Sequence, residues 1–311
     1  MIRRPGLTSG GTSRVVAGGV ALLPHLAGTI RKRNLLGRNL NPSVSSTSGR
    51  TIDRAASCGR ADYDGGDWAW EFLRRNPDYI ADWRSSVPKH LPCITLCDGT
   101  RLLRLRRRFL RAEKWGLHAF ADPRLCAQET NVFWHANALK RVVRLNAKRP
   151  TEGEVATVRR LADFNAHRQA VINADGVPLV MLKRNGVSVP VEISGLSNLT
   201  APFVPIIELH DLDDLSAQTE LLKRLQRFTD PDFRAIQKPS FASDERLHLA
   251  LIALDESMKG KTYRQIAIAI FGEKKVTEEW YGHSQFLRDR TRRLVAKGIE
   301  LMKGGYRDLL G

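Results

Sequence analysis

The stretch from Thr262 to Arg307 constrains the fold most strongly, because its spacing predicts two amphipathic helices. Thr262 and Gln265 have the spacing of a capping box, so a helix is predicted to begin there, and Gly272 can end it in a left-handed turn. A second helix is predicted to begin near Ser284. One side of that helix is apolar or small and is expected to be buried; it comprises Leu287, Thr291, Leu294, Val295, Gly298 and Met302.

The opposite side of the second predicted helix is polar and basic. Gln285, Arg288 and Arg292 fall on it, with Asp289 and Arg293 beside them. Amide and guanidinium groups hydrogen-bond to base edges and phosphates, so this helix is predicted to contact a DNA groove. The spacing also fits a solvated surface helix in which Asp289 pairs with Arg292 or Arg293. Spacing alone leaves both interpretations open.

The connector between the two predicted helices, Glu273 to His283, is longer than the roughly three or four residues of a tight helix-turn-helix. It therefore holds a wing-like excursion, or the second helix begins before Ser284. Phosphate contacts are expected from Tyr263, Arg264, Arg290 and Arg293, and base contacts from Gln285, Arg288 and Arg292. The full set of predicted DNA-contacting residues is Tyr263, Arg264, Gln265, Ser284, Gln285, Arg288, Arg290, Arg292 and Arg293.

Longer strings in the chain resemble a known family. TYRQIAIAIFG, followed by FLRDRTRRLVAKGIELMKGGYRDLL, closely resembles the C-terminal domain of alphaproteobacterial helix-turn-helix transcriptional regulators, formerly catalogued as a domain of unknown function. DWAWEFLRRNPDY, at residues 67–79, resembles the transcriptional-regulator-like N-terminal domain often found with it. KWGLHAFADPRL and VFWHANALKRVVRL resemble the connecting part, so the resemblance covers about residues 62–310.

The resemblance implies a function and a setting. Several members are found on integrative and conjugative elements, and the full-length arrangement is similar to that of excision activators of rhizobial symbiosis elements. It therefore implies a sequence-specific, double-stranded-DNA-binding regulator, an activator tied to a mobile element, in the bacterial cytoplasm. RNA polymerase or a regulatory protein would be a further partner, and the protein could form a homodimer. The alternative is a protein-interaction module or antiactivator without sequence-specific DNA binding.

The charge balance predicts a polyanionic partner, since the pI is about 10.2 and the formal net charge is +17. Part of this charge lies in a Gly/Ser/Arg-rich segment, residues 1–61, which is predicted to be a disordered basic tail. Without an apolar run of about eighteen residues, no membrane-spanning helix is expected and no membrane partner is predicted.

The rest of the chain predicts an α+β protein with three further domains. Residues 62–125 form an N-terminal helical regulator-like domain. Within it Asp67 to Trp83 is helical, with a helix stop at Asn76-Pro77 and with three tryptophans as its core or as a protein-binding face. Thr100 to Trp115 is predicted to be a basic amphipathic helix. Residues 126–230 form a small central antiparallel sheet followed by a helix, and residues 240–311 form the C-terminal helix-turn-helix-like helical domain.

The sheet is predicted from alternation and turn residues. Asn185-Gly186 is typical of a two-residue hairpin turn, and alternate valines after it indicate a strand with one buried face. Pro190 lies in this strand and predicts an edge position, because proline has no N–H to donate.

Chemistry-bearing motifs are few. His90, Cys93 and Cys97 could hold zinc, but a second ligand pair is missing, so Cys58, Cys93, Cys97 and Cys126 are expected to be structural thiols and no metal is predicted. Walker A, GxSxG and HExxH motifs are absent, so no cofactor and no catalytic residues are predicted. Tyr306 lies where a tyrosine recombinase has its nucleophile, but the HxxR spacing is missing. We therefore expect a packing role for Tyr306 and no enzymatic activity.

Overall fold

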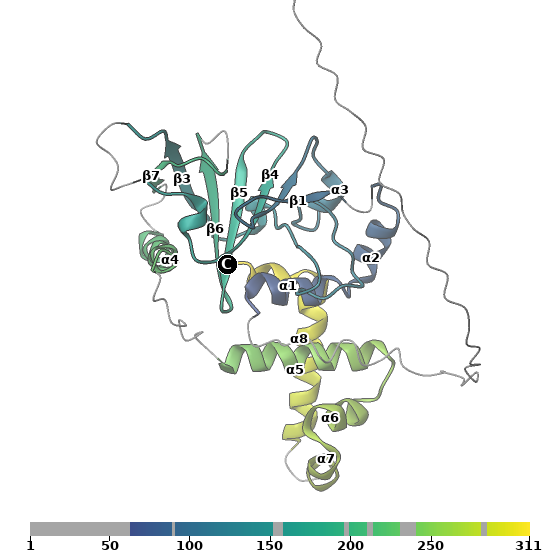
Figure 1. Cartoon of the computed structure of the whole chain (residues 1–311). Helices are drawn as coiled ribbons and strands as arrows, with labels where there is room; N and C mark the ends of the chain where they lie inside the picture. The colour runs from purple at the N-terminus through teal and green to yellow at the C-terminus, as the bar shows by residue number, and fades with distance from the viewer. Residues whose placement is uncertain are drawn as a thin grey trace, which may run out of the picture. The chain divides into compact units, whose positions relative to one another are not determined.

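The computed structural model describes residues 63–88, 91–151, 158–195, 199–209, 214–230, 241–280 and 285–311. The predicted basic tail, residues 1–61, lies outside them. Over the described residues the chain forms eight α-helices and one seven-stranded sheet, which confirms the mixed α+β class (Figure 1). No helix in this part of the chain is long and apolar enough to cross a membrane.

The sheet is mostly antiparallel, as predicted, but two of its six strand pairings are parallel. Its strands are β1 (Cys93–Thr95), β2 (Arg101–Arg104), β3 (Val143–Lys148), β4 (His167–Ile172), β5 (Pro178–Arg184), β6 (Val187–Ser194) and β7 (Val204–Glu208). They lie in the order β1-β2-β4-β5-β6-β3-β7. Pairings β2–β4 and β3–β6 are parallel and the others antiparallel. Parallel neighbours are joined by long crossovers, which leave no turn signal in the sequence.

The β5–β6 hairpin forms as predicted. Asn185 and Gly186 make its two-residue turn with φ values of 50° and 72°, the left-handed region that such turns require. Val187, Val189 and Val191 on β6 are all buried. The hairpin therefore fixes which face of the central strands enters the core.

The edge position predicted from Pro190 is wrong, because β6 lies between β5 and β3. Pro190 is paired with Met181 of β5, and counting from the hairpin turn places it at a position whose N–H would point away from β5. The pairing of β6 with β3 begins only at Val191. The missing N–H therefore removes no hydrogen bond from either neighbour.

The helix predicted over Thr100 to Trp115 is also wrong. Its first part is strand β2, and only Leu110–Glu113 is helical, as α3. Leu102 and Leu103 are both buried, in two different core clusters. Successive side chains of a strand point to opposite faces of the sheet. Because both leucines are buried, one on each face, this segment forms a strand although its spacing also fits a helix.

The predicted helical region, Asp67 to Trp83, forms two helices that are separated before Pro77. α1 (Gly65–Leu73) begins with a capping box between Asp64 and Asp67. α2 (Pro77–Arg84) follows, and the side-chain oxygen of Asn76 accepts hydrogen bonds from the first backbone N–H groups of that helix. Helix α4 (Leu215–Arg227) confirms the helix predicted after the sheet, and α5 (Phe241–Met258) lies at the start of the region predicted to be the C-terminal helical domain.

The tryptophans form a core, which decides between the two predicted roles. Trp68, Trp70 and Trp83 are 2%, 0% and 6% exposed. The cluster that contains Trp68 and Trp70 also includes side chains from near the C-terminus of the chain, namely Ala250, Leu251, Leu254, Leu301, Met302, Tyr306 and Leu310. The regulator-like helices and the C-terminal helices therefore share one core (Figure 1).

The cysteines give no metal site in the part of the chain that the structure describes. Cys93 and Cys97 are exposed and Cys126 is buried, and these three cysteines form no disulfide with a described residue. No group of three or more histidine, cysteine or acidic residues there is arranged to hold a metal ion. His90 and Cys58 lie outside the described residues.

Candidate nucleic-acid interface

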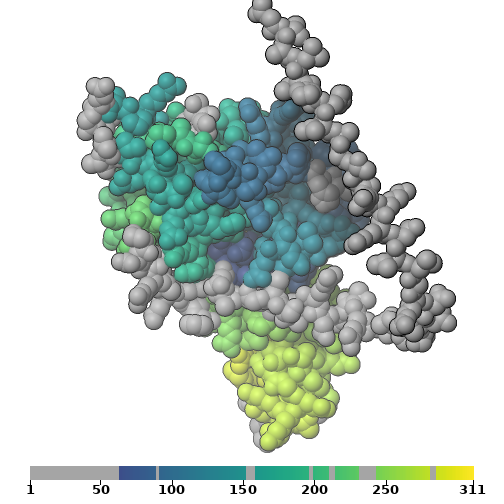
Figure 2. Space-filling view, in the orientation of Figure 1, coloured from purple at the N-terminus to yellow at the C-terminus, as the bar shows by residue number. Residues whose placement is uncertain are grey.

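Three helices make up the candidate interface. They are α6 (Tyr263–Phe271), α7 (Glu273–Glu279) and α8 (Phe286–Lys303). In the space-filling view their yellow-green atoms show a broad exposed surface (Figure 2). Gly272 alone connects α6 to α7, with a φ of 86° that favours glycine, as predicted for the end of the first helix.

Helix α7 was not predicted, since the connector was expected to hold a wing-like excursion or an earlier start of the second helix. The missed signal is the spacing of Val276 and Trp280, four residues apart. Both are buried with Ala267 of α6 and Leu287 of α8. Lys274 and Lys275 are exposed on α7 and are further candidates for phosphate contact.

The buried side of α8 is confirmed. Leu287, Thr291, Val295, Gly298 and Met302 are buried, and Leu294 is half-buried. A methyl group on Gly298 would lie 2.6 Å from the carbonyl oxygen of Ala250, so α8 crosses α5 in close contact at this glycine.

The arginines of α8 differ in how far they are exposed to solvent. Arg292 and Arg293 are exposed; Arg292 lies 3.6 Å from the Asp289 carboxylate, a surface ion pair of small energy. Arg288 and Arg290 are half-buried instead. The Arg288 Nε donates to the Trp280 carbonyl at 2.8 Å, and the Arg290 guanidinium lies 5.0 Å from the centre of the Phe271 ring. Arg288 and Arg290 therefore fasten α8 to the neighbouring helices.

The remaining predicted contact residues gather at helix starts. Tyr263 is exposed in the first turn of α6. Gln265 closes the capping box, where its Oε1 accepts from the Thr262 N–H at 2.9 Å. Arg264 beside it is half-buried, and its buried Nε has no hydrogen-bond partner among the described residues. Gln285 is exposed directly before α8, and Ser284 lies outside the described residues.

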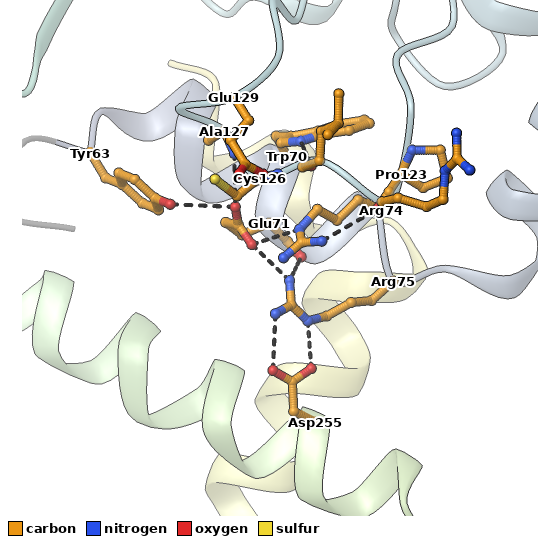
Figure 3. A network of polar contacts seen from close by, with 12 residues as sticks. Tyr63, Trp70, Glu71, Arg74, Arg75, Pro123, Cys126, Ala127, Glu129 and Asp255 are labelled. Carbon is orange, nitrogen blue, oxygen red and sulfur yellow. Dashed lines mark hydrogen bonds and ion pairs between the residues drawn. The ribbon is translucent and has the colours of Figure 1, made fainter. Parts of the chain in front are cut away.

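A buried ionic network joins α1 to α5 (Figure 3). The guanidinium of Arg75 holds Asp255 through two hydrogen bonds, of 2.5 and 2.9 Å, and donates to Glu71 at 2.8 Å. Arg74 and the N–H of Ala127 also donate to Glu71. Burial raises the pKa of Glu71, but Arg74 and Arg75 lower it by more, so the net pKa lies below the usual range.

Tyr306 packs as predicted and does not point to solvent. It is 1% exposed, and its hydroxyl donates to the Trp115 carbonyl at 2.9 Å. Burial raises the pKa of this hydroxyl. An inaccessible, protonated phenol suits a structural role and not a nucleophile.

Comparisons with known proteins match both ends of this arrangement. Residues 204–311 match the family described as "T6SS, Transcription factor, DNA binding domain", a segment that begins at β7 and includes α4 to α8. Residues 53–118 match the "Proteobacterial transcriptional regulator-like domain". The chain is similar to DNA-binding transcriptional regulators. No curated protein matches it.

The two matches support the general prediction of a DNA-binding regulator but not its details. They indicate a transcriptional regulator with DNA as its partner, in agreement with the resemblance found in the sequence. The first match contains every predicted contact residue, from Tyr263 to Arg293. Individual contacts, the sign of regulation and a mobile-element setting remain predictions.

Proposed function

We propose that this chain is a sequence-specific transcriptional activator in the bacterial cytoplasm, associated with a mobile genetic element. It binds double-stranded DNA through the helix-turn-helix-like unit of α6, α7 and α8. The observation that carries the proposal is the exposed pair Arg292 and Arg293 on a helix whose other side is buried, within a segment that matches a DNA-binding domain family. RNA polymerase or a regulatory protein is the proposed second partner, and a homodimer would supply two half-sites.

The proposal is tested by selecting bound DNA from a random pool with the purified full chain, then measuring affinity against salt. A DNA reader should enrich one motif, and its affinity should fall steeply with salt as counterions are released. A protein-interaction module should enrich no motif and show no steep salt dependence.

Arg292→Ala and Arg293→Ala are expected to affect DNA binding in different ways. If Arg292 contacts a base, its loss should cost about 1–3 kcal/mol at the selected site and relax the preference at one position. If Arg293 contacts phosphate, its loss should weaken binding to all sequences and lower the salt slope by about one unit. Fluorescence anisotropy with selected and random duplexes measures both.

Lys297→Ala is the matched control, because Lys297 is an exposed cation on the same helix that pairs with Glu300 at 2.9 Å. It should change affinity by less than either arginine variant. Identical losses for all three variants on all sequences would mean that α8 acts only through its charge, and the assignment of base contacts would then be wrong.

A further inference from the structure

Helix α8 begins with an exposed aromatic side chain, Phe286. Phe286 is 58% exposed, whereas the next residue, Leu287, is 2% exposed and packs with Ala267 and Val276. A single exposed apolar side chain is common on protein surfaces and indicates no function by itself. The place of Phe286 within the candidate interface, and not its exposure alone, is therefore the basis for assigning it a role.

Phe286 lies on the same exposed side of α8 as Arg293. The two are seven residues apart, which is only about 20° short of two full helical turns, and both side chains are exposed. Arg293 forms no ion pair with a described residue, and Asp289, which lies between the two, pairs instead with Arg292 at 3.6 Å. This side of α8 therefore presents an apolar ring in line with a cation that can contact a phosphate.

Phe286 also lies at the end of α8 that reads bases in helix-turn-helix proteins. Exposed large apolar side chains occur twice in the described part of α6 to α8, at Tyr263 and Phe286, and each is the first residue of its helix. In helix-turn-helix proteins the first residues of the second helix contact base edges, while the first helix crosses the DNA backbone. With α8 as the second helix, Phe286 occupies a base-contacting position.

We propose that Phe286 recognises a thymine in the DNA site by packing against its C5 methyl group. A phenyl ring carries no hydrogen-bonding group, so it can distinguish base edges only by apolar contact. In the major groove, thymine alone among the four bases presents a methyl group, and phenylalanine is one of the side chains that contact it. This assignment rests on the proposed DNA binding by α8, and it adds a specificity-determining residue to the contacts predicted from the sequence.

The experiment uses the purified full chain and the duplex that it selects from a random pool. Each thymidine of that duplex is replaced in turn by deoxyuridine, which removes the C5 methyl group and keeps the base pairing. At one position the replacement should weaken binding about fourfold, the effect of burying one methyl-sized group. Phe286→Ala should bind the thymine duplex more weakly than the unmodified chain and should bind the thymine and uracil duplexes equally. Fluorescence anisotropy measures these affinities.

Met258→Ala is the matched control, because Met258 is another exposed apolar side chain, 54% exposed at the end of α5. It should retain the full preference for thymine at that position. Phe286→Leu keeps an apolar side chain and should retain part of the preference, so it tests the same contact if Phe286→Ala does not fold. Circular dichroism during heating shows whether each variant is folded.

A selected site in which every thymine can be replaced without loss, or a thymine preference that persists in Phe286→Ala, would overturn the assignment. So would an equal loss of affinity for the thymine and uracil duplexes in Phe286→Ala, with the thymine preference kept. That outcome is expected if Phe286 inserts between bases or contacts a second copy of the chain. The absence of any enriched sequence would instead overturn the proposed function itself, so the two failures are distinguishable.

Discussion

A fragment of residues 240–311 should lack a cooperative unfolding transition, although it contains every candidate DNA-contacting residue. Leu251 of α5 and Leu301 of α8 are buried in the same cluster as Trp68 and Trp70 of α1. Each large apolar side chain that loses its cover costs about 1.5–3 kcal/mol, and a domain is stable by only about 5–15 kcal/mol. The loss of several such contacts exceeds the stability of a 72-residue piece, the length of 240–311 inclusive.

Circular dichroism during heating measures this directly, and the matched control is residues 63–311, which retain all of α1 and α2. The longer fragment should melt cooperatively and bind the selected DNA, whereas the shorter one should do neither. A short fragment that melts cooperatively and binds with the affinity of the full chain would show a self-contained C-terminal domain, as the sequence alone predicts. We propose instead that the C-terminal helices depend on α1.

Arg75→Ala should destabilise the protein by about 3–5 kcal/mol. Arg75 is 9% exposed and joins two carboxylates, Glu71 of the preceding helix α1 and Asp255 on α5. Removing the cation takes one of two guanidinium partners from the buried Glu71, which keeps Arg74, and removes both hydrogen bonds that Arg75 donates to Asp255. Breaking a buried ion pair in this way is far costlier than losing a surface pair. Chemical denaturation followed by tryptophan fluorescence gives the free energy of unfolding.

Asp255→Ala is the comparison variant with a smaller expected loss of stability. Asp255 is 30% exposed, so water can partly replace the hydrogen bonds that are lost with its carboxylate. Its cost should be clearly smaller than that of Arg75→Ala. The pKa of folded Glu71 is lowered, so the stabilisation is present above its ordinary pKa of 4.5 and is lost as pH falls through the folded value. The gap between the unmodified chain and Arg75→Ala should therefore shrink below pH 4.5; a constant gap would contradict the role given to Glu71.

Local signals in the sequence predicted local structure well. The capping box at Thr262 and Gln265, the hairpin turn at Asn185 and the helix stop before Pro77 are each decided by residues within a few positions, and all three are present. The buried side of α8 could also be predicted, since helical spacing alone determines which side chains share a face.

Features decided by distant partners could not be predicted this way. Leu102 and Leu103 look like part of a basic helix, and only their pairing with β4 and cover on both sheet faces make them a strand. Likewise, nothing near Arg288 indicates that its Nε binds the carbonyl of Trp280. A helical wheel gives the direction of a side chain but not the neighbour that occupies that direction.

The continuity of α8 has a consequence for the angular setting of the candidate DNA-contacting face. It is one helix of 18 residues, about 27 Å long at about 1.5 Å per residue. Leu287 near its start packs with α6 and α7, while Leu301 near its end lies in the tryptophan core. Arg292 and Arg293 thus keep a fixed helical phase relative to that core, and each residue inserted between Arg293 and Leu301 would rotate them by about 100°. The length of α8 between Arg293 and Leu301, as well as its side chains, therefore sets the direction of the candidate DNA-contacting arginines relative to the tryptophan core.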